Sequence, residues 1–339
     1  MISDRKATIY DVAKTANVSV GTVSRYLNGQ TLRQSNRDQV ERAIEALSFR
    51  ANSMARAIRA DSTKVIGFLV REIDEFHGTL LEKLSRQFQA SGYKIMTYCH
   101  DERQEEVMDA VDYFAGQRVD ALIMGGAPEA AAAVRRIIEE NIPVITYNND
   151  VLGMNVDRVF VDNQNAAARA VSHLIDLGHT RIAHIAGRQD VSTGVARREG
   201  YVTALRRAGI DLEDALIEQG NWHVDGGYAA SARLMHLERP PTAIFTANYL
   251  MAVGVLEGAR DHGWSIPDTF SLVSFDDTQL FRFYPEGISA ISQPVDEIAK
   301  SIVETTLARL QGAEVAATTT RTIQCNLILR GSTRPPVRR

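Results

Sequence analysis

The chain has 339 residues, of which 45% are hydrophobic and 24% are charged. This composition is typical of a globular protein, and the length predicts two or three domains rather than one. The longest apolar runs, such as Val65–Val70, are far shorter than the roughly 20 residues that a membrane-spanning helix needs. Residues 1–6 precede no apolar stretch, and Cys99 and Cys325 are too few for a disulfide framework, so we expect a reduced cytoplasmic protein.

Charge is distributed unevenly along the chain. The net charge is −4, yet residues 1–64 carry 11 Lys and Arg against 6 Asp and Glu, and the remaining 275 residues carry 27 against 36. A basic head on an acidic body is the distribution expected when only the head contacts nucleic-acid phosphates. A solvated basic helical surface would carry the same charge, so charge alone leaves both interpretations open.

The head is predicted to form three short helices. Thr8 can cap the first helix with support from Asp11, and Asn17 suits the tight turn that follows. Ser19 can cap the second helix, and the pair Asn28–Gly29 is typical of a helix end. The expected bounds are residues 9–16, 19–27 and 35–47, the last with an apolar face of Val40, Ile44 and Leu47.

From residue 65 onward, short apolar strands alternate with amphipathic helices. This pattern predicts parallel sheets covered by helices on both faces. Two doubly wound subdomains with a cleft between them fit the pattern, and a single eight-stranded barrel is the alternative. The expected strands are 65–70, 94–98, 121–124, 144–147, 159–161, 181–186, 243–246 and 272–275. The expected helices include 80–90, 107–115, 130–140, 166–177, 196–207 and 252–261.

The second helix of the head has two faces of different character. One face can pack against the first helix through small apolar side chains. The other is small or polar and suits the major groove of DNA, where arginine can bind guanine and hydroxyl groups can bind phosphates. An inert helical hairpin is the alternative. The expected core is Val12, Ala13, Ala16, Val18, Val23 and Leu27, and the other face is Val20, Gly21, Thr22, Ser24 and Arg25.

The run from Thr8 to Asn28 closely resembles the DNA reader of the lactose-repressor/galactose-repressor family, whose pattern is (T/S)-I-x-D-V-A-x-x-A-x-V-S-x-x-T-V-S-R-x-L-N. The resemblance implies a dimeric repressor with a hinge helix and a core like that of sugar-binding proteins. DNA contacts are then expected from Thr8, Ser19, Val20, Gly21, Thr22, Ser24, Arg25 and Asn28 in the reader, and from Asn52, Ala55 and Ile58 in the hinge.

Residues 49–58 resemble the hinge of that family, (Y/F)-x-P-N-x-x-A-R-x-L. In the family this helix folds on DNA and inserts a leucine into the minor groove, where the bent DNA allows further contacts. The chain departs from the pattern at two positions. Ala51 replaces the proline that would preset the first helical turn, and Ile58 is a stiffer apolar side chain than leucine.

The resemblance continues through residues 118–123, 173–183, 293–295 and 323–333. It implies two three-layer subdomains that the chain crosses three times, rather than a barrel. His173, His179 and His184 are close in sequence, but no carboxylate or cysteine completes a recognisable ligand set, so we expect no metal and no cofactor.

An effector site between the subdomains is also implied by the resemblance. Arg197 falls at the arginine of R-x-x-G-(Y/F), and Asp276 ends the strand (Y/F)-D-D. Asn148 and Tyr249 stand where aspartate is usual, which suggests a less acidic pocket than a plain hexose site and leaves a sugar, sugar acid, sugar phosphate or polyol open. Arginine, carboxylate and amide groups can bind vicinal hydroxyls while an aromatic ring covers the sugar. The expected contacts are Phe76, Asn148, Arg197, Trp222, Asn248, Asp276 and Gln293.

The expected domains follow from these patterns. They are a helix-turn-helix domain of residues 1–48, a hinge and linker of 49–64, a core of 65–333 and a disordered tail of 334–339. Within the core, the N-subdomain covers about 65–161 and 293–320, and the C-subdomain about 162–292 and 321–333. Because the tail is too short and proline-broken for a tetramer-forming helix, we expect a homodimer.

The predicted function is sequence-specific repression at a pseudo-palindromic operator, controlled by a small effector. An enzyme is not expected, since the chain lacks a G-x-S-x-G elbow, a phosphate loop and a dinucleotide fingerprint. A transport-type binding protein would share the core but not the reader. Control by a protein corepressor or a non-sugar metabolite is the alternative mode of regulation.

Overall fold

A computed structural model describes residues 7–27, 30–49, 62–100, 103–312 and 318–337. They belong to two compact units, one up to Thr63 and one from Lys64 onward. In the described segments, no helix has both the length and the apolar character needed to cross a bilayer.

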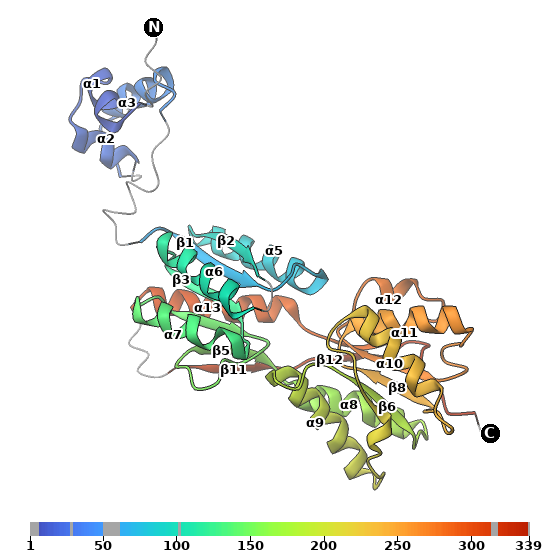
Figure 1. Ribbon diagram of the computed structural model, residues 1–339. Helices are drawn as coiled ribbons and strands as arrows, with labels where there is room; N and C mark the ends of the chain where they lie inside the picture. The colour runs from blue at the N-terminus through green and yellow to red at the C-terminus, as the bar shows by residue number, and fades with distance from the viewer. Residues whose placement is uncertain (1–6, 28–29, 50–61, 101–102, 313–317, 338–339) are drawn as a thin grey trace. The chain divides into compact units, whose positions relative to one another are not determined.

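The described residues of the first unit form a bundle of three helices, α1 (Ile9–Thr15), α2 (Val20–Leu27) and α3 (Gln34–Ala46), drawn in blue in Figure 1. The local signals predicted for α1 are confirmed: the Asp11 carboxylate accepts from the Thr8 N–H at 2.8 Å, and the Thr8 hydroxyl accepts from the Asp11 N–H at 3.4 Å. Asn17 has a φ of 51° at the turn, and the Ser19 hydroxyl caps α2 by accepting from the Thr22 N–H at 3.1 Å. The buried core is Val12, Ala13, Ala16, Val23, Val40 and Ala43.

The N-subdomain of the second unit contains a parallel sheet with helices on both faces (Figure 1). Its strand order is β11-β5-β4-β3-β1-β2. Alternate side chains such as Phe68 pack under α5 and α13, whereas Leu122 packs under α6 and α7. The strands are β1 (Val65–Val70), β2 (Lys94–Cys99), β3 (Ala121–Gly125), β4 (Val144–Tyr147), β5 (Asp157–Val161) and β11 (Thr320–Ile323). The helices are α5 (Glu75–Ala90), α6 (Gln104–Gly116), η1 (Pro128–Ala130), α7 (Ala131–Glu139) and α13 (Val295–Leu310).

The C-subdomain repeats this arrangement with the strand order β12-β10-β9-β8-β6-β7, in which only β12 is antiparallel to its neighbour. Helices α8 and α9 cover one face, and α10 and α11 cover the other. The strands are β6 (Ile182–Ala186), β7 (Ile217–Gln219), β8 (Ala243–Thr246), β9 (Ser271–Phe275), β10 (Ser289–Ser292) and β12 (Asn326–Ile328). The helices are α8 (Asn163–Asp176), α9 (Ser192–Arg207), η2 (Asp214–Leu216), α10 (Val224–Met235), α11 (Tyr249–His262) and α12 (Leu280–Phe283).

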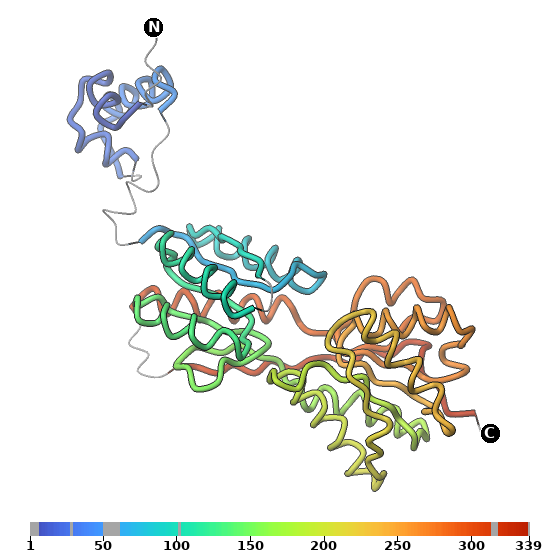
Figure 2. The backbone as a smooth tube through the Cα atoms, viewed as in Figure 1, coloured from blue at the N-terminus to red at the C-terminus, as the bar shows by residue number. Residues whose placement is uncertain are grey.

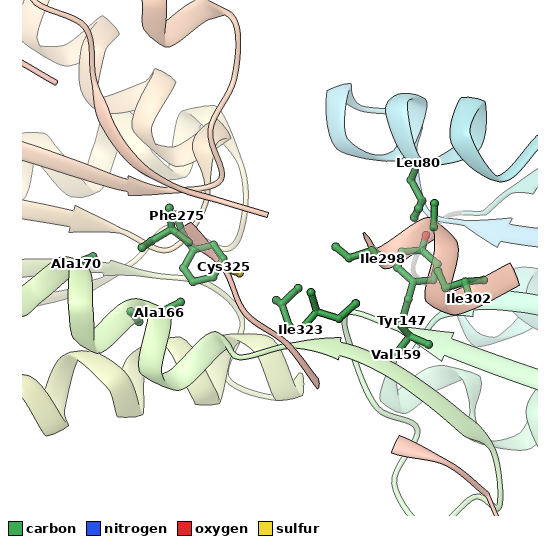
Figure 3. Packing of buried hydrophobic residues seen from close by; sticks show 14 of the residues in the cluster. Leu80, Tyr147, Val159, Ala166, Ala170, Phe275, Ile298, Ile302, Ile323 and Cys325 are labelled. Atoms are coloured by element: carbon green, nitrogen blue, oxygen red, sulfur yellow. The ribbon is translucent and has the colours of Figure 1, made fainter. Parts of the chain in front are cut away.

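The chain crosses between the subdomains three times, after β5, after β10 and after β11 (Figure 2). Figure 3 shows the third crossing from close by: Ile323 lies between a group of buried side chains around Tyr147 and Ile298 and another around Phe275 and Cys325. Two open sheets of six strands therefore form the core, and the barrel alternative does not apply.

Two details of the C-terminal segment differ from the expected bounds. The third crossing comes after Ile323 rather than after residue 320, because residues 320–323 pair with β5 in the N-subdomain and only then does the chain reach the edge of the other sheet. The tail is not disordered at its start. The Arg334 N–H donates to the Ser271 hydroxyl at 3.1 Å, and its carbonyl oxygen lies 2.9 Å from His179 Nε2, which ties this residue to the C-subdomain.

Candidate functional site

The proposed DNA-reading face lies on α2. Arg25 and Gly21 are exposed, and Val20 and Ser24 are half-buried. Thr22 is less accessible than the other predicted contacts of α2: it is only 8% exposed, and its hydroxyl lies 2.9 Å from that of Ser19. Thr22 has low exposure because its side chain turns toward Ser19, the residue that caps the start of α2.

The other predicted DNA contacts are distributed between described and undescribed parts of the chain. Thr8 is half-buried, and its polar groups are engaged in the cap of α1, while Ser19 is exposed at the start of α2. Asn28 and the hinge positions Ala51, Asn52, Ala55 and Ile58 lie outside the described residues.

A cleft in the core is lined by residues of both subdomains. Its walls come from the segments that follow β1, β3 and β4 on one side and β6, β8 and β9 on the other. In parallel sheets this carboxyl edge is where ligands bind. The structure brings all seven predicted effector contacts to this cleft: Phe76, Asn148, Arg197, Trp222, Asn248, Asp276 and Gln293.

Arg197 lies at the base of the cleft on α9 and is 4% exposed. Its Nε donates to Asn163 Oδ1 at 2.9 Å, and its Nη1 donates to the Ala247 carbonyl at 2.5 Å. The guanidinium lies 3.6 Å from the centroid of the Phe275 ring, a cation–π contact. Burial lowers the pKa of Arg197, and the neighbouring Asp276 opposes that shift.

Asp276 follows β9 with a φ of 67°, which turns its side chain toward the cleft. Its Oδ2 lies 3.5 Å from Arg197 Nη1, and its Oδ1 accepts from Gln293 Nε2 at 2.6 Å. Burial raises the pKa of Asp276, although Arg197 and Gln293 both favour the ionised form. The buried Gln293 Oε1 has no hydrogen-bond partner among the described residues. This oxygen can accept a hydrogen bond, and Gln293 lines the cleft.

Asn248 positions an aromatic wall as well as lining the cleft. Its Oδ1 caps α11 by accepting from the Met251 N–H at 3.0 Å, and its Nδ2 donates to the Trp222 carbonyl at 3.1 Å. The Trp222 ring lies directly over Gly187, where an added Cβ would come within 2.1 Å of it. The ring position therefore requires glycine at residue 187.

Three polar residues on the N-subdomain side were missed from the sequence. Asp74 caps α5, and its Oδ1 accepts from the His77 N–H at 2.8 Å and lies 2.6 Å from His77 Nδ1. Burial raises the pKa of Asp74, but the hydrogen bonds and charge of His77 outweigh it, so the net shift is downward. Tyr147 is fully buried at the end of β4, and burial with Asp74 nearby raises its pKa well above the ordinary value. The sequence signal that could have identified this group was Asp74, a helix-capping residue in the connection between β1 and α5.

The expected lower acidity of the pocket, relative to a plain hexose site, stays a prediction, because carboxylates and arginines both line the cleft. Asn148 does line the cleft in place of an aspartate, but the structure supplies Asp74, Glu129 and Asp276 around the same space. Asp74 and Glu129 come from connections that carry no family motif, so the sequence did not place them in the site.

The three histidines noted in the sequence serve packing. His173 Nε2 lies 3.0 Å from the Thr333 hydroxyl, and His179 Nδ1 lies 2.8 Å from that of Thr242. His184 is stacked between two rings in the core. Across the residues that the structure describes, no group of three or more His, Cys, Asp or Glu side chains is arranged to hold a metal ion.

Comparison with known proteins gives matches over nearly the whole chain. Residues 8–52 match the family model for bacterial regulatory proteins of the lacI family, and residues 171–333 match a periplasmic binding protein-like domain. The HTH-type transcriptional repressor CytR of Escherichia coli (strain K12) is 31% identical over 334 residues, covering 97% of this chain and 96% of that protein.

Two solved structures resemble the chain along its length. The transcriptional regulator CelR in complex with cellobiose is 26% identical with a TM-score of 0.74, covering 96% of this chain and 100% of that one. The lac repressor dimer bound to operator and the anti-inducer ONPF has a TM-score of 0.86 at 24% identity, covering 97% of this chain and 100% of that one.

Proposed function

The chain belongs to the lacI family of bacterial regulatory proteins, and from that premise we propose that it represses transcription at an operator whose occupancy a small effector controls. It is a DNA-binding transcription regulator, as its relatives are, and not an enzyme. The observation that carries the proposal is the presence in one chain of a capped helix-turn-helix and a cleft lined by both core subdomains.

Two chains pair and present two readers to a pseudo-palindromic operator in the cytoplasm. The resemblance to a structure of the lac repressor dimer bound to operator supports this assembly. Arg25, Gly21, Val20, Ser24, Ser19 and Thr8 contact DNA from the described part of the reader, with Asn28, Asn52, Ala55 and Ile58 beyond it. Thr22, whose hydroxyl lies beside that of Ser19 at the start of α2, contacts a DNA phosphate there.

The effector binds in the cleft to Arg197, Asp276 and Gln293, with Phe76 and Trp222 as aromatic walls and Asn148 and Asn248 as amide contacts. The similar regulator CelR is in complex with cellobiose, which supports a sugar or a related molecule. An effector changes operator affinity only if it prefers one closure state of the cleft, so effector and operator affinities are reciprocally coupled. A protein corepressor is not favoured, because the polar groups converge inside a cleft between the subdomains rather than on an outer face.

The test combines operator selection with substitution of Arg197. Operators are selected from random duplexes, and effectors are found by their rise in Tm, since a ligand that binds only the folded state stabilises it by mass action. Arg197→Ala should keep specific operator binding but lose the effector response. It should also melt at a lower temperature, because Asn163 and the Ala247 carbonyl lose a buried partner.

The matched control is Arg206→Ala, an exposed arginine on the same helix, which should respond as the wild type does. A normal effector response in Arg197→Ala would remove this residue from the site. An effector that binds the core without changing operator affinity would contradict the proposed function.

A further inference from the structure

Lys64 is the first residue of the core unit, and its backbone is left-handed. Its φ of 57° is uncommon for a residue with a Cβ atom, and such a conformation persists only where the surroundings enforce it. The linker predicted from the sequence ends at this residue. Whatever fixes the backbone of Lys64 therefore also fixes the direction in which the linker enters the core.

Contacts from two other segments hold Lys64 in this conformation. Its N–H donates to Asp120 Oδ2 at 3.2 Å, and its carbonyl oxygen accepts from the Lys94 N–H at 2.9 Å. Its Nζ donates to the Tyr93 hydroxyl at 3.0 Å and lies 4.4 Å from the centroid of the same ring, a cation–π contact. Backbone and side chain of Lys64 are therefore both tied to the start of β2 and to the entry of β3.

The groups that hold Lys64 are themselves fixed in the N-subdomain. Tyr93 is buried, and its ring packs edge-on against that of Phe88 with 6.4 Å between the centroids. The Asp120 N–H donates to the Val65 carbonyl at 2.7 Å. An exposed lysine usually keeps the rotamer freedom that Lys64 loses when it closes over a buried ring. The joint between linker and core is therefore more rigid than a simple tether requires.

Building on the proposed pairing of two readers on one operator, we propose that Lys64 is a positioning residue for operator recognition, because it makes the joint between linker and core rigid. Once one reader of a dimer occupies its half-site, the other binds intramolecularly, at an effective concentration that depends on the stiffness of the connection. A joint that is fixed before binding leaves less conformational entropy to lose when both readers are bound. Lys64 thereby raises the affinity for the complete operator without contacting DNA.

The first experiment compares Lys64→Gly with the wild type on two duplexes. One duplex is the full operator selected from random DNA, and the other carries a single half-site of that operator. Glycine adopts a positive φ without strain, so the core should keep its Tm while the joint loses the side-chain contacts and becomes flexible. Lys64→Gly should raise the Kd for the full operator about fivefold and leave the Kd for the half-site unchanged. Fluorescence anisotropy measures both constants.

Further variants separate the joint from charge and backbone effects. Lys64→Arg should restore most of the full-operator affinity, because arginine can also donate to the Tyr93 hydroxyl and lie over the ring. Tyr93→Phe removes that hydroxyl and should give an intermediate Kd. Lys94→Met removes a neighbouring exposed charge, and Asn141→Gly places glycine at another exposed residue with a positive φ, 60°. Both controls should keep the wild-type ratio of the two Kd values.

A wild-type ratio in Lys64→Gly would overturn the inference and leave the proposed function standing. Equal weakening on both duplexes would also overturn it, because Lys64 would then be a DNA contact or a general stabiliser of the fold. If the ratio falls in Lys64→Gly but no effector changes operator affinity, the inference stands and the proposed function fails.

Discussion

His184 is a buried histidine enclosed by aromatic rings on β6. The ring centroids of Tyr201 and Phe245 each lie 5.1 Å from its own, and its Nε2 has no hydrogen-bond partner among the described residues. Burial lowers the pKa of His184 to about 4, against a weaker opposing effect of the Phe245 carbonyl. In the unfolded chain, His184 therefore binds a proton below about pH 6.5, whereas in the folded core it stays neutral down to about pH 4. The stabilising contribution of the neutral ring is complete above pH 6.5 and is lost as the pH falls.

We predict that His184→Phe makes the core less sensitive to acid. Phenylalanine can keep the stacking but cannot bind a proton, so the variant should lose about 2 kcal/mol less unfolding free energy than the wild type between pH 7 and pH 5. Urea unfolding of both proteins at the two pH values measures this difference. His173 and His179, whose pKa values burial also lowers, are present in both proteins and cancel. Equal losses in the two proteins would show that His184 is already protonated or solvated.

Arg25 is the exposed cation of α2, and its side chain leans along the helix with Nε 3.4 Å from the Gly21 carbonyl. We predict that Arg25→Ala weakens binding to the specific operator by about 1–3 kcal/mol and weakens binding to random DNA much less, because a base contact is lost as well as a charge. Fluorescence anisotropy with both duplexes at one salt concentration measures the ratio. Arg42→Ala, which removes an exposed charge from α3, should weaken both equally. Equal weakening by Arg25→Ala would make Arg25 a phosphate contact.

For single residues, the sequence patterns correctly located side chains that lie at the ends of strands. The seven predicted cleft residues line one space because the motifs that carry them follow β strands or begin helices. Asp74 and Tyr147 were missed because each acquires its role only when the segment after β1 lies beside the end of β4. Thr22 is more buried than a helical wheel of α2 suggests, because its hydroxyl lies beside that of Ser19.

Helix α1 begins at a reciprocal cap formed by Thr8 and Asp11. Thr8 and Asp11 satisfy each other's backbone N–H groups, and their side chains also share a 2.6 Å hydrogen bond. We predict that Thr8→Ala destabilises the reader by about 1 kcal/mol, whereas Thr8→Ser stays close to the wild type, because serine keeps the hydroxyl. Hydrogen exchange of the α1 amides in the full-length protein measures the loss. Unchanged exchange in Thr8→Ala, together with weaker operator binding, would instead assign Thr8 a direct DNA contact.

Elements with strong apolar patterns could be located from the sequence, and weakly patterned ones could not. The bounds of β1, β4 and β8 are as predicted, because each is a short apolar run between turns. Strand β7 reads Ile-Glu-Gln and β10 reads Ser-Ala-Ile-Ser, so neither has the apolar content that marks a strand. Their conformation comes from pairing with β6 and β9, which is tertiary information.

The two subdomains are joined across the cleft by hydrogen bonds at two places. The Glu75 carboxylate at the start of α5 accepts from the Thr278 hydroxyl and from the Gln279 N–H, the latter at 3.1 Å. Asn149 Oδ1 accepts from the Thr193 N–H at 3.0 Å and from its hydroxyl at 2.6 Å. These contacts form only when the subdomains are close, so they favour the closed cleft.

We predict that Glu75→Gln shifts the core toward an open cleft. A neutral amide is a weaker acceptor than a carboxylate, and a loss of about 1 kcal/mol would make opening about fivefold more frequent. Hydrogen exchange of the Gln279 amide should speed up by this factor, and a bound effector should dissociate faster. Glu82→Gln on the same helix, where the exposed carboxylate pairs with the exposed Arg86, is the control. Unchanged exchange at Gln279 would mean that Glu75 does not hold the cleft.

The short segment that holds β11 and β12 supplies an edge strand to each sheet within nine residues of chain. During synthesis, neither subdomain can complete its sheet until this segment has left the ribosome. The two halves of the sensor are therefore finished almost simultaneously, although β1 of one and β6 of the other emerged long before. A nascent chain that ends before residue 320 would carry two unfinished sheets, each with an open edge that can pair with another chain. Complete translation thus protects both subdomains from aggregation at one step.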